Sequence, residues 1–267
     1  GDYPWRGVRL NQFLTHTAGL PAWFPYYKQL MKIPSEALRW PWLYEQVAKE
    51  KRAKSKKSLY SDLDFFVLGF ALEEIFERDL YRCWTQLKGE LPYTRLHFCK
   101  HNNPFYERKA YAPTEQCSWR KKRIRGEVHD DNAWSLGGVA PHAGLFGRME
   151  DVITWGRSLR NILLGNETWA TTKVATKYVR RAIKPSLGDW GLGFMMPAIS
   201  GASCGQWFSK KSIGHLGFTG TSFWWDPEVD LMVVILSNRV YHSRNHPQLK
   251  KVRPVLHDIV YESMINS

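Results

Sequence analysis

Two polar stretches of this 267-residue chain carry side chains that could do chemistry. Tyr60 stands directly before a segment whose pattern predicts a helix, and the positive end of a helix dipole favours a phenolate there. A nearby cation would favour the phenolate further, although a tyrosine before a capped helix is more often only packed. His215 stands with Gly217 and Gly220 at the start of HLGFTGTSFWWDPEVDLMVVILSN. These polar and glycine residues at the start of an apolar hairpin either serve the fold or line a site.

Two serine motifs are interpreted as loops. Gly201–Gly205 (GASCG) matches G-x-S-x-G, but the nucleophile elbow needs a strand before it and a helix directly after it. Ser118–Lys121 (SWRK) matches S-x-x-K, in which lysine lies one helical turn from a nucleophilic serine. This copy lies in a charged stretch without apolar periodicity, where a nucleophile would lack a rigid, preorganised surrounding.

The histidines and cysteines do not predict a metal or a cofactor. His129 and His142 lack the helical i, i+4 pairing of a zinc helix, so we expect them to bond local backbone within a loop. His16, in LTHTAGLP, is interpreted as structural. The four cysteines form no C-x-x-C pair, which weakens zinc and redox interpretations.

The elements that must position these residues follow an α+β order. Apolar spacing predicts helices over 9–21, 60–80 and 149–165, with Ser61 and Asp64 as a capping box for the second. Residues 81–125 are expected to be loop-rich. From residue 191 the pattern predicts an antiparallel three-strand meander, made of QWFSKK, GHLGFTGTSFWWD and DLMVVILSNRV with a turn at DPEVD, and then a C-terminal helix. We predict a single domain over 1–267, with 1–190 mostly helices and loops and 191–267 holding the strands and last helix.

The composition is that of a globular protein with a basic surface. The chain is 43% hydrophobic and 14% aromatic, which suits a sizeable core and pocket, and its formal net charge is +13. Lys49–Ser58 and Arg120–Gly126 hold two basic clusters, interpreted mainly as solvated loops because no nucleic-acid-reading module accompanies them. A nucleic-acid partner is therefore not expected. We also find no apolar run of 18 residues and no signal peptide.

Four segments, in order along nearly the whole chain, resemble the serine β-lactamase and penicillin-binding-protein family, in its branch of class C β-lactamases, DD-peptidases and esterases. The first two are LNQFLTHTAGLP, similar to L-L-T-H-T-S-G-L-P, and YSDLDFFVLG, similar to the Y-x-N segment and its helix. GEVHDDNAWSLGGVAPHAGLF and the stretch from His215 resemble the V-H-D-x-N-A and H-T-G-F-T-G-T-S segments. The resemblance implies a β-lactamase-like fold, an antiparallel sheet flanked by a helical region.

The family's roles carry over by position. Tyr60 would move protons to and from a serine nucleophile, and Asp62 takes the place usually held by asparagine, which makes substrate amide recognition less certain. His215 takes the place of the lysine in K-T-G and could donate to a substrate carboxylate or support Tyr60. Gly217 would let the substrate lie against the strand edge. The resemblance assigns Phe218 and Thr219 to substrate and oxyanion binding, through the Phe218 N–H in particular.

The family's Ser-x-x-Lys nucleophile is expected upstream of LNQFLTHTAGLP, and no serine precedes Asn11 here. We therefore expect the nucleophile helix and the first strands of the sheet to be missing from these residues. Either this is the larger part of an ordinary hydrolase, whose N-terminal part is cleaved, omitted or supplied by a partner chain, or it is a non-catalytic relative that binds peptidoglycan fragments or a protein. We favour the first, because Tyr60 and the glycines around His215 are kept. In addition, loss of the family's central buried helix would leave an apolar face exposed, at a cost of roughly 1.5–3 kcal/mol for each large side chain. The expected activity is acyl transfer on a D-Ala-D-Ala-type peptide, a β-lactam or a small ester, and the resemblance suggests the cell envelope or periplasm.

Overall fold

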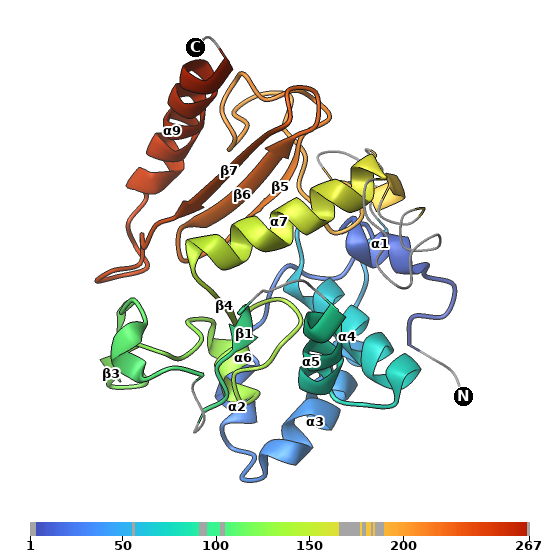
Figure 1. Ribbon diagram of the computed structural model, residues 1–267. Helices are drawn as coiled ribbons and strands as arrows, with labels where there is room; N and C mark the ends of the chain where they lie inside the picture. The colour runs from blue at the N-terminus through green and yellow to red at the C-terminus, as the bar shows by residue number, and fades with distance from the viewer. Residues whose placement is uncertain are drawn as a thin grey trace. The chain divides into compact units, whose positions relative to one another are not determined.

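The chain divides into two compact units in the computed structural model (Figure 1). Unit 1 comprises Gly1–Ala112 and Ile124–Arg148, and unit 2 comprises Pro113–Arg123 and Met149–Ser267. The structure describes residues 4–54, 57–90, 95–101, 105–165, 177, 180–182, 184 and 190–265. Across these residues, no helix combines the length and the apolar character that crossing a membrane requires.

Unit 1 is mainly helical. Its elements are α1 (Leu10–Leu14), α2 (Tyr27–Leu30), α3 (Glu36–Lys49), α4 (Asp62–Phe76), α5 (Leu80–Glu90), the strand β1 (His97–Phe98), the 3-10 turn η1 (Arg108–Ala110), α6 (Asp131–Ser135) and the strand β4 (Leu145–Phe146). The two short strands pair antiparallel, with His97 opposite Phe146.

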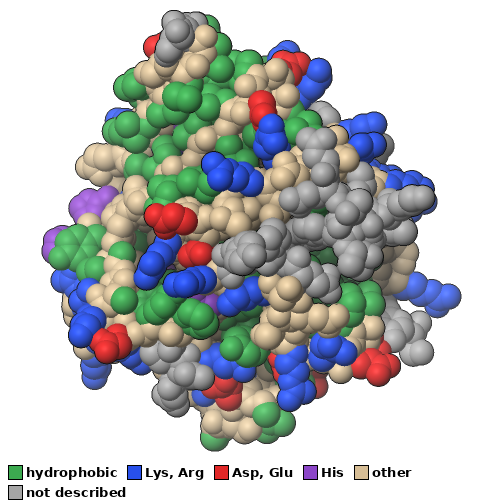
Figure 2. All heavy atoms as spheres, viewed as in Figure 1, with side chains coloured by type: hydrophobic (Ala, Val, Ile, Leu, Met, Phe, Trp, Pro, Cys, Tyr) green, Lys and Arg blue, Asp and Glu red, His purple; other side chains and the backbone are tan. Residues whose placement is uncertain are grey.

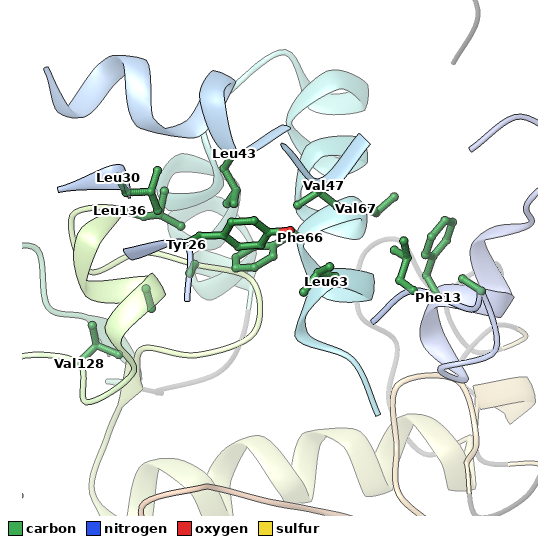
Figure 3. Close-up of a cluster of buried hydrophobic side chains, with 14 residues drawn as sticks. Phe13, Tyr26, Leu30, Leu43, Val47, Leu63, Phe66, Val67, Val128 and Leu136 are labelled. Atoms are coloured by element: carbon green, nitrogen blue, oxygen red, sulfur yellow. The ribbon is translucent and has the colours of Figure 1, made fainter. Parts of the chain in front are cut away.

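The core of unit 1 forms where α2, α3, α4 and α6 meet (Figure 3). Leu63 and Phe66 of α4 are fully buried, and so are Leu43 and Val47 of α3. The i, i+3 and i+4 spacing places these side chains on one face of each helix, so the two helices share one apolar interface. Burying such a side chain contributes about 1.5–3 kcal/mol, so the shared interface holds the start of α4 in place.

The N-terminus of α4 is capped by Ser61, but the predicted capping box is only half formed, because the Ser61 N–H donates to His16 and not to the Asp64 side chain. The Ser61 Oγ accepts a hydrogen bond from the Asp64 N–H at 3.2 Å and donates one to the Pro21 carbonyl at 2.6 Å. Tyr60 therefore lies just outside the helix and Asp62 in its first turn. The predicted end at Leu80 is wrong, because Glu77 adopts a left-handed conformation with φ of 51° and stops the helix at Phe76.

Three other sequence predictions in unit 1 need correction. The helix expected over 9–21 covers only Leu10–Leu14. The segment 81–125, expected to be loop-rich, begins with the helix α5, and α3 was not predicted. The remainder of that segment contains short strands and turns, in line with its loop-rich pattern.

Unit 2 is a three-stranded antiparallel sheet between two helices. Its elements are β2 (Gln116–Cys117), β3 (Lys122–Arg123), α7 (Met149–Leu164), β5 (Ile213–Leu216), β6 (Thr221–Asp226), β7 (Leu231–Leu236) and α9 (Gln248–Ile265). The strand order is β5-β6-β7, with His215 opposite Phe223 and Trp224 opposite Val233.

The two faces of this sheet pack against different helices, as Figure 1 shows for α7 and α9. Phe223 and Trp225 point to the α7 side, in a cluster with Leu159 of that helix. Trp224, between them in sequence, lies in the opposite cluster with Tyr261 of α9. This alternation is the period of two that a strand imposes on its side chains.

The helix α9 also carries an exposed apolar face. Green hydrophobic surface gathers in the upper part of Figure 2, where α9 lies. The exposed hydrophobic residues of this helix are Val252, Val255, Leu256, Ile259, Val260, Met264 and Ile265. This surface exceeds the scattered apolar side chains that a solvent-facing helix usually shows.

The predicted antiparallel three-strand meander is confirmed, but the predicted bounds of its strands are wrong. QWFSKK, Gln206–Lys211, is not a strand. The segment predicted as one strand, GHLGFTGTSFWWD, forms both β5 and β6, joined by a turn over 217–220. The DPEVD turn, α7 and the C-terminal helix are confirmed, although α9 begins six residues before Pro254.

Candidate active site

The predicted site residues fall into two sets, one in each unit. Tyr60 and Asp62 lie at the start of α4 in unit 1, whereas His215, Gly217, Phe218 and Thr219 lie at the end of β5 and in the following turn of unit 2.

Tyr60 lies beside a buried histidine at the N-terminus of α4. Its ring centroid is 4.7 Å from that of His16, and its side chain forms a hydrogen bond with Asp62. Partial burial of the phenol raises the pKa of Tyr60, and the negative charges of Asp62 and Asp130 raise it further. The expectation that this position favours the phenolate is therefore wrong, because burial of the phenol, together with the charges of Asp62 and Asp130, outweighs the helix dipole. Tyr60 is a neutral phenol.

Asp62 belongs to a cluster with Asp130 and His142. One ligand-type atom of each of these residues lies within 4.8 Å of the other two. The Nε2–H of His142 donates to Oδ1 of Asp130 at 3.0 Å, and the same oxygen accepts the Ala133 N–H at 2.8 Å. Asp130 is thereby the N-cap of α6, and it fixes a histidine twelve residues further along the chain.

The cluster is an ion pair next to a third carboxylate. Burial alone acts to raise the pKa of Asp130, but the charge and hydrogen bond of His142 and the Ala133 N–H lower it to about 2. Burial alone acts to lower the pKa of His142, but the charge of Asp130, their hydrogen bond and the charge of Asp62 together raise it. The pKa of Asp62 is raised by burial, and His142 offsets only part of that shift.

This arrangement differs from the sequence prediction for the same loop. His142 bonds the side chain of Asp130 and not local backbone. The spacing of the three residues could accommodate a cation, but Nε2 of His142 and Oδ1 of Asp130 are already bonded to each other. His129 is also buried, and its charge helps to lower the pKa of Asp130.

His16 is buried against the start of α4, where it contacts Ser61 and Asp64. It is 1% exposed, and its Nδ1 lies 3.1 Å from Oδ2 of Asp64 and 3.1 Å from the Ser61 N. Burial raises the pKa of Asp64, and the hydrogen bond from His16 offsets part of that shift. These buried contacts support the structural role predicted for His16.

In unit 2, His215 is the penultimate residue of strand β5, and its side chain is oriented by the backbone. Its Nδ1–H donates to the Leu216 carbonyl at 2.9 Å, and its ring lies 5.8 Å from that of Trp190. The neighbouring Gly217 is closely enclosed, since a Cβ there would lie 2.0 Å from Oγ1 of Thr221. A larger residue at this position would therefore require the Thr221 side chain to move.

The turn after β5 is held by an arginine that the sequence analysis did not select. Arg239 donates from Nε to the Phe218 carbonyl at 2.6 Å and from its backbone N–H to the Thr219 carbonyl at 2.9 Å. Its guanidinium also lies 4.3 Å from the centre of the Phe218 ring, which is 60% exposed. The sequence signal, a lone arginine after β7, is too common to single out.

The two serine motifs lie in loops, as predicted. Ser118–Lys121 forms the turn of the β2–β3 hairpin, and Lys121 has a left-handed φ of 53°. Gly201–Gly205 is a loop in which Cys204 is fully buried, with no helix directly after it. All four cysteines are free thiols.

Comparisons with known proteins agree with this architecture. A family model described as Beta-lactamase matches residues 1–253. The "Putative D-alanyl-D-alanine carboxypeptidase" of Salmonella agona (strain SL483) is 28% identical over 269 residues, which cover 91% of this chain and 60% of that protein. The protein of the same name from Salmonella typhi has the same identity and coverage. The chain thus spans about 60% of the length of these curated relatives.

Solved structures with the same fold are more distant in sequence. A penicillin binding protein from Bacillus halodurans superposes with a TM-score of 0.64 at 17% identity, over 96% of this chain and 76% of that one. Simvastatin synthase from Aspergillus terreus has a TM-score of 0.62 at 15% identity, over 96% and 69%. These likenesses establish the α+β fold that the sequence predicts.

Proposed function

This chain belongs to the beta-lactamase family, and from that membership we propose that it serves acyl transfer through a serine ester. The observation that carries the proposal is the hydrogen-bonded Tyr60–Asp62 pair at the N-terminus of α4. It provides a proton-transfer group at the position where the family resemblance expects one. The enclosed Gly217 and oriented His215 provide a strand edge for substrate.

Each residue has a distinct proposed role. Tyr60 passes protons to and from the nucleophile, and His215 donates a hydrogen bond to a substrate carboxylate. Gly217 allows an extended substrate to approach the strand edge, Thr219 contacts that substrate, and the Phe218 N–H stabilises the oxyanion. Arg239 keeps the Phe218 backbone in place through its carbonyl.

We place the nucleophilic serine on a segment outside these 267 residues. Within the described residues, β7 is an edge strand that pairs only with β6. Beside it lies a groove of about 670 Å³, lined by Met149, Ile153 and Arg157 of α7, by Met232 of β7 and by Val260 of α9. An edge strand and adjoining apolar groove suit strand addition by a further polypeptide segment. The longer curated relatives have room for such a segment.

The proposed substrate is a peptide ending in D-Ala-D-Ala, at the cell envelope. The names of the Salmonella relatives support this class, and a free terminal carboxylate suits both His215 and a chain of net charge +13. β-Lactams and small esters are the other acyl donors that the same chemistry would accept.

The test is acylation of the complete gene product by a fluorescent penicillin, together with release of D-alanine from a D-Ala-D-Ala peptide. Tyr60→Phe should slow acylation by about 10²–10⁴-fold, the usual range for losing a proton-transfer group. Tyr241→Phe is a matched control, because Tyr241 is 44% exposed and Tyr60 is 42% exposed. Saturable binding of muropeptides with no covalent mass change would contradict the proposal and indicate a binding protein instead.

A further inference from the structure

The neutral phenol of Tyr60 poses a question about where the proton goes. A phenol that is already protonated can accept the proton of a serine hydroxyl only if it releases its own proton. Tyr60 forms its hydrogen bond with the Asp62 carboxylate, so one acceptor is already in contact.

The surroundings of Asp62 suit a proton acceptor. Its carboxylate lies within 4.8 Å of both Asp130 and His142, at the start of α4. The His142 side chain is only 2% exposed and is held by the 3.0 Å hydrogen bond to Asp130. A buried imidazolium beside Asp62 stabilises its ionised form, and Asp130 keeps that imidazolium charged and oriented.

We propose that Asp62 is the terminal proton acceptor of the site, reached through Tyr60, and that the Asp130–His142 ion pair positions Asp62 and maintains its charge. In this scheme Tyr60 and Asp62 are the catalytic residues, whereas Asp130 and His142 are positioning residues. The inference rests on the proposed acyl transfer, and it deepens that function by tracing its proton.

The proton transfers balance at each step. As the serine Oγ forms a bond to the substrate carbonyl carbon, the Oγ–H proton passes to Oη of Tyr60. At the same time the Tyr60 proton passes to a carboxylate oxygen of Asp62, and the carbonyl oxygen becomes the oxyanion. On collapse of the intermediate, the C–N bond breaks and its electron pair goes to the leaving nitrogen. That nitrogen takes a proton from Tyr60, which recovers one from Asp62.

The scheme fixes a pH dependence. The titratable groups that act on Asp62 are Tyr60, His142, Asp130 and His16. Because burial raises the pKa of Asp62, the acylation rate should fall as the pH drops through a value above the ordinary 3.8. His142 opposes that rise, so removing its charge should move this acid limb to a higher pH.

The first experiment measures acylation rates of the complete gene product from pH 4 to 9. Asp62→Asn should lose about 10²-fold or more, because an amide cannot accept the proton, and it should lose the acid limb. His142→Gln should keep the donor to Asp130 but move the acid limb upward. Asp79→Asn, the same change before the N-terminus of α5, should leave rate and profile unaltered.

A second measurement does not depend on activity. Histidine NMR titration should show a lower pKa for His142 in Asp62→Asn, because the Asp62 charge contributes to its elevation. Spectra of His142→Gln identify the resonance. An unchanged pKa for His142, or equal acylation rates and profiles in wild type and Asp62→Asn, would overturn the relay alone. Absence of any acylation in the wild-type protein would overturn the proposed function, and the relay with it.

Discussion

Gly156 of α7 packs directly against Met232 of β7, since a Cβ on this glycine would lie 2.7 Å from the methionine Sδ and 2.8 Å from the Phe223 ring. The close approach lets α7 lie flat on one face of the β5-β6-β7 sheet. Gly89 of α5 is the contrasting case, because a Cβ there would meet nothing within 4 Å.

Gly156→Ala should therefore destabilise the protein although alanine favours a helix. Overpacking of a core contact costs about 1–3 kcal/mol, against a helix-propensity gain of about 1 kcal/mol. Gly89→Ala should gain up to about 1 kcal/mol, because only the propensity changes. Urea unfolding of both variants measures the difference, and equal stability changes would contradict this packing. Met232→Ala combined with Gly156→Ala should lose less than the sum of the two single changes.

Arg244→Leu should cost about 1.5–3 kcal/mol, because it removes the charge-assisted hydrogen bonds that Arg244 donates to the buried Glu115 carboxylate. Glu115 is 5% exposed, and Arg244 donates to its two oxygens from Nε at 3.1 and 2.8 Å. Arg160→Leu is the control, since Arg160 pairs with Asp230 at the surface and such pairs contribute about 0–1 kcal/mol. Similar losses in both variants, measured by thermal and chemical unfolding, would count against a buried role for Glu115.

Asp130→Asn should destabilise the protein most between about pH 4 and 6.5. A carboxylate with a lowered pKa stabilises the fold above its ordinary value of 3.8, and this stability is lost as the pH falls through about 2. A histidine with a raised pKa stabilises the fold below its ordinary 6.5, and this stability is lost as the pH rises through the elevated value. The depression of the Asp130 pKa corresponds to about 2 kcal/mol.

Unfolding free energies of wild type and Asp130→Asn across this range give the measurement. Asparagine is also a good N-cap, so the start of α6 is preserved and the difference reports the ion pair. A constant difference from pH 2 to 8 would show that Asp130 and His142 are not paired ions.

His257 should make the protein less stable in mild acid. It is fully buried beside Phe208, and burial, followed by the charge of Arg253, lowers its pKa to about 4. The folded state therefore resists protonation, and stability present above the ordinary 6.5 is lost as the pH falls towards about 4. His257→Phe should flatten this part of the stability profile. A profile unchanged from wild type would contradict the neutral, buried imidazole.

Local patterns predicted the start of α4, which carries Tyr60 and Asp62, and the strand β7. Ser61 and the apolar spacing after it fix the start of α4, and the long apolar run fixes β7. Each of these signals is contained within a few consecutive residues, so it can be recognised without knowledge of the tertiary structure. The α5 helix was missed because α4 ends at Glu77 without the glycine or proline that usually marks a stop.

The contacts between distant segments could not be predicted in this way. Asp130 and His142 are twelve residues apart, which matches no helical or strand period, and only the folded loop brings them together. QWFSKK has a strand-like composition but is not a strand. Its side chains instead bond to distant residues, with Trp207 donating to Glu262 and Ser209 to Asp226. The reversed expectation for Tyr60 has a similar origin, because the burial that raises its pKa arises only in the folded chain.

The β2–β3 hairpin gives the chain an order of assembly. Residues 113–123 belong to unit 2 although the sequence on both sides of them belongs to unit 1. Their anchors arrive late during synthesis, since Asn238 binds the Pro113 carbonyl across 125 residues and Arg244 binds Glu115 across 129. During synthesis, the unit 1 residues up to Arg148 would thus emerge from the ribosome while the loop over 113–123 still lacks its anchors. Until Asn238 and Arg244 had emerged, this loop would be accessible to proteases and chaperones.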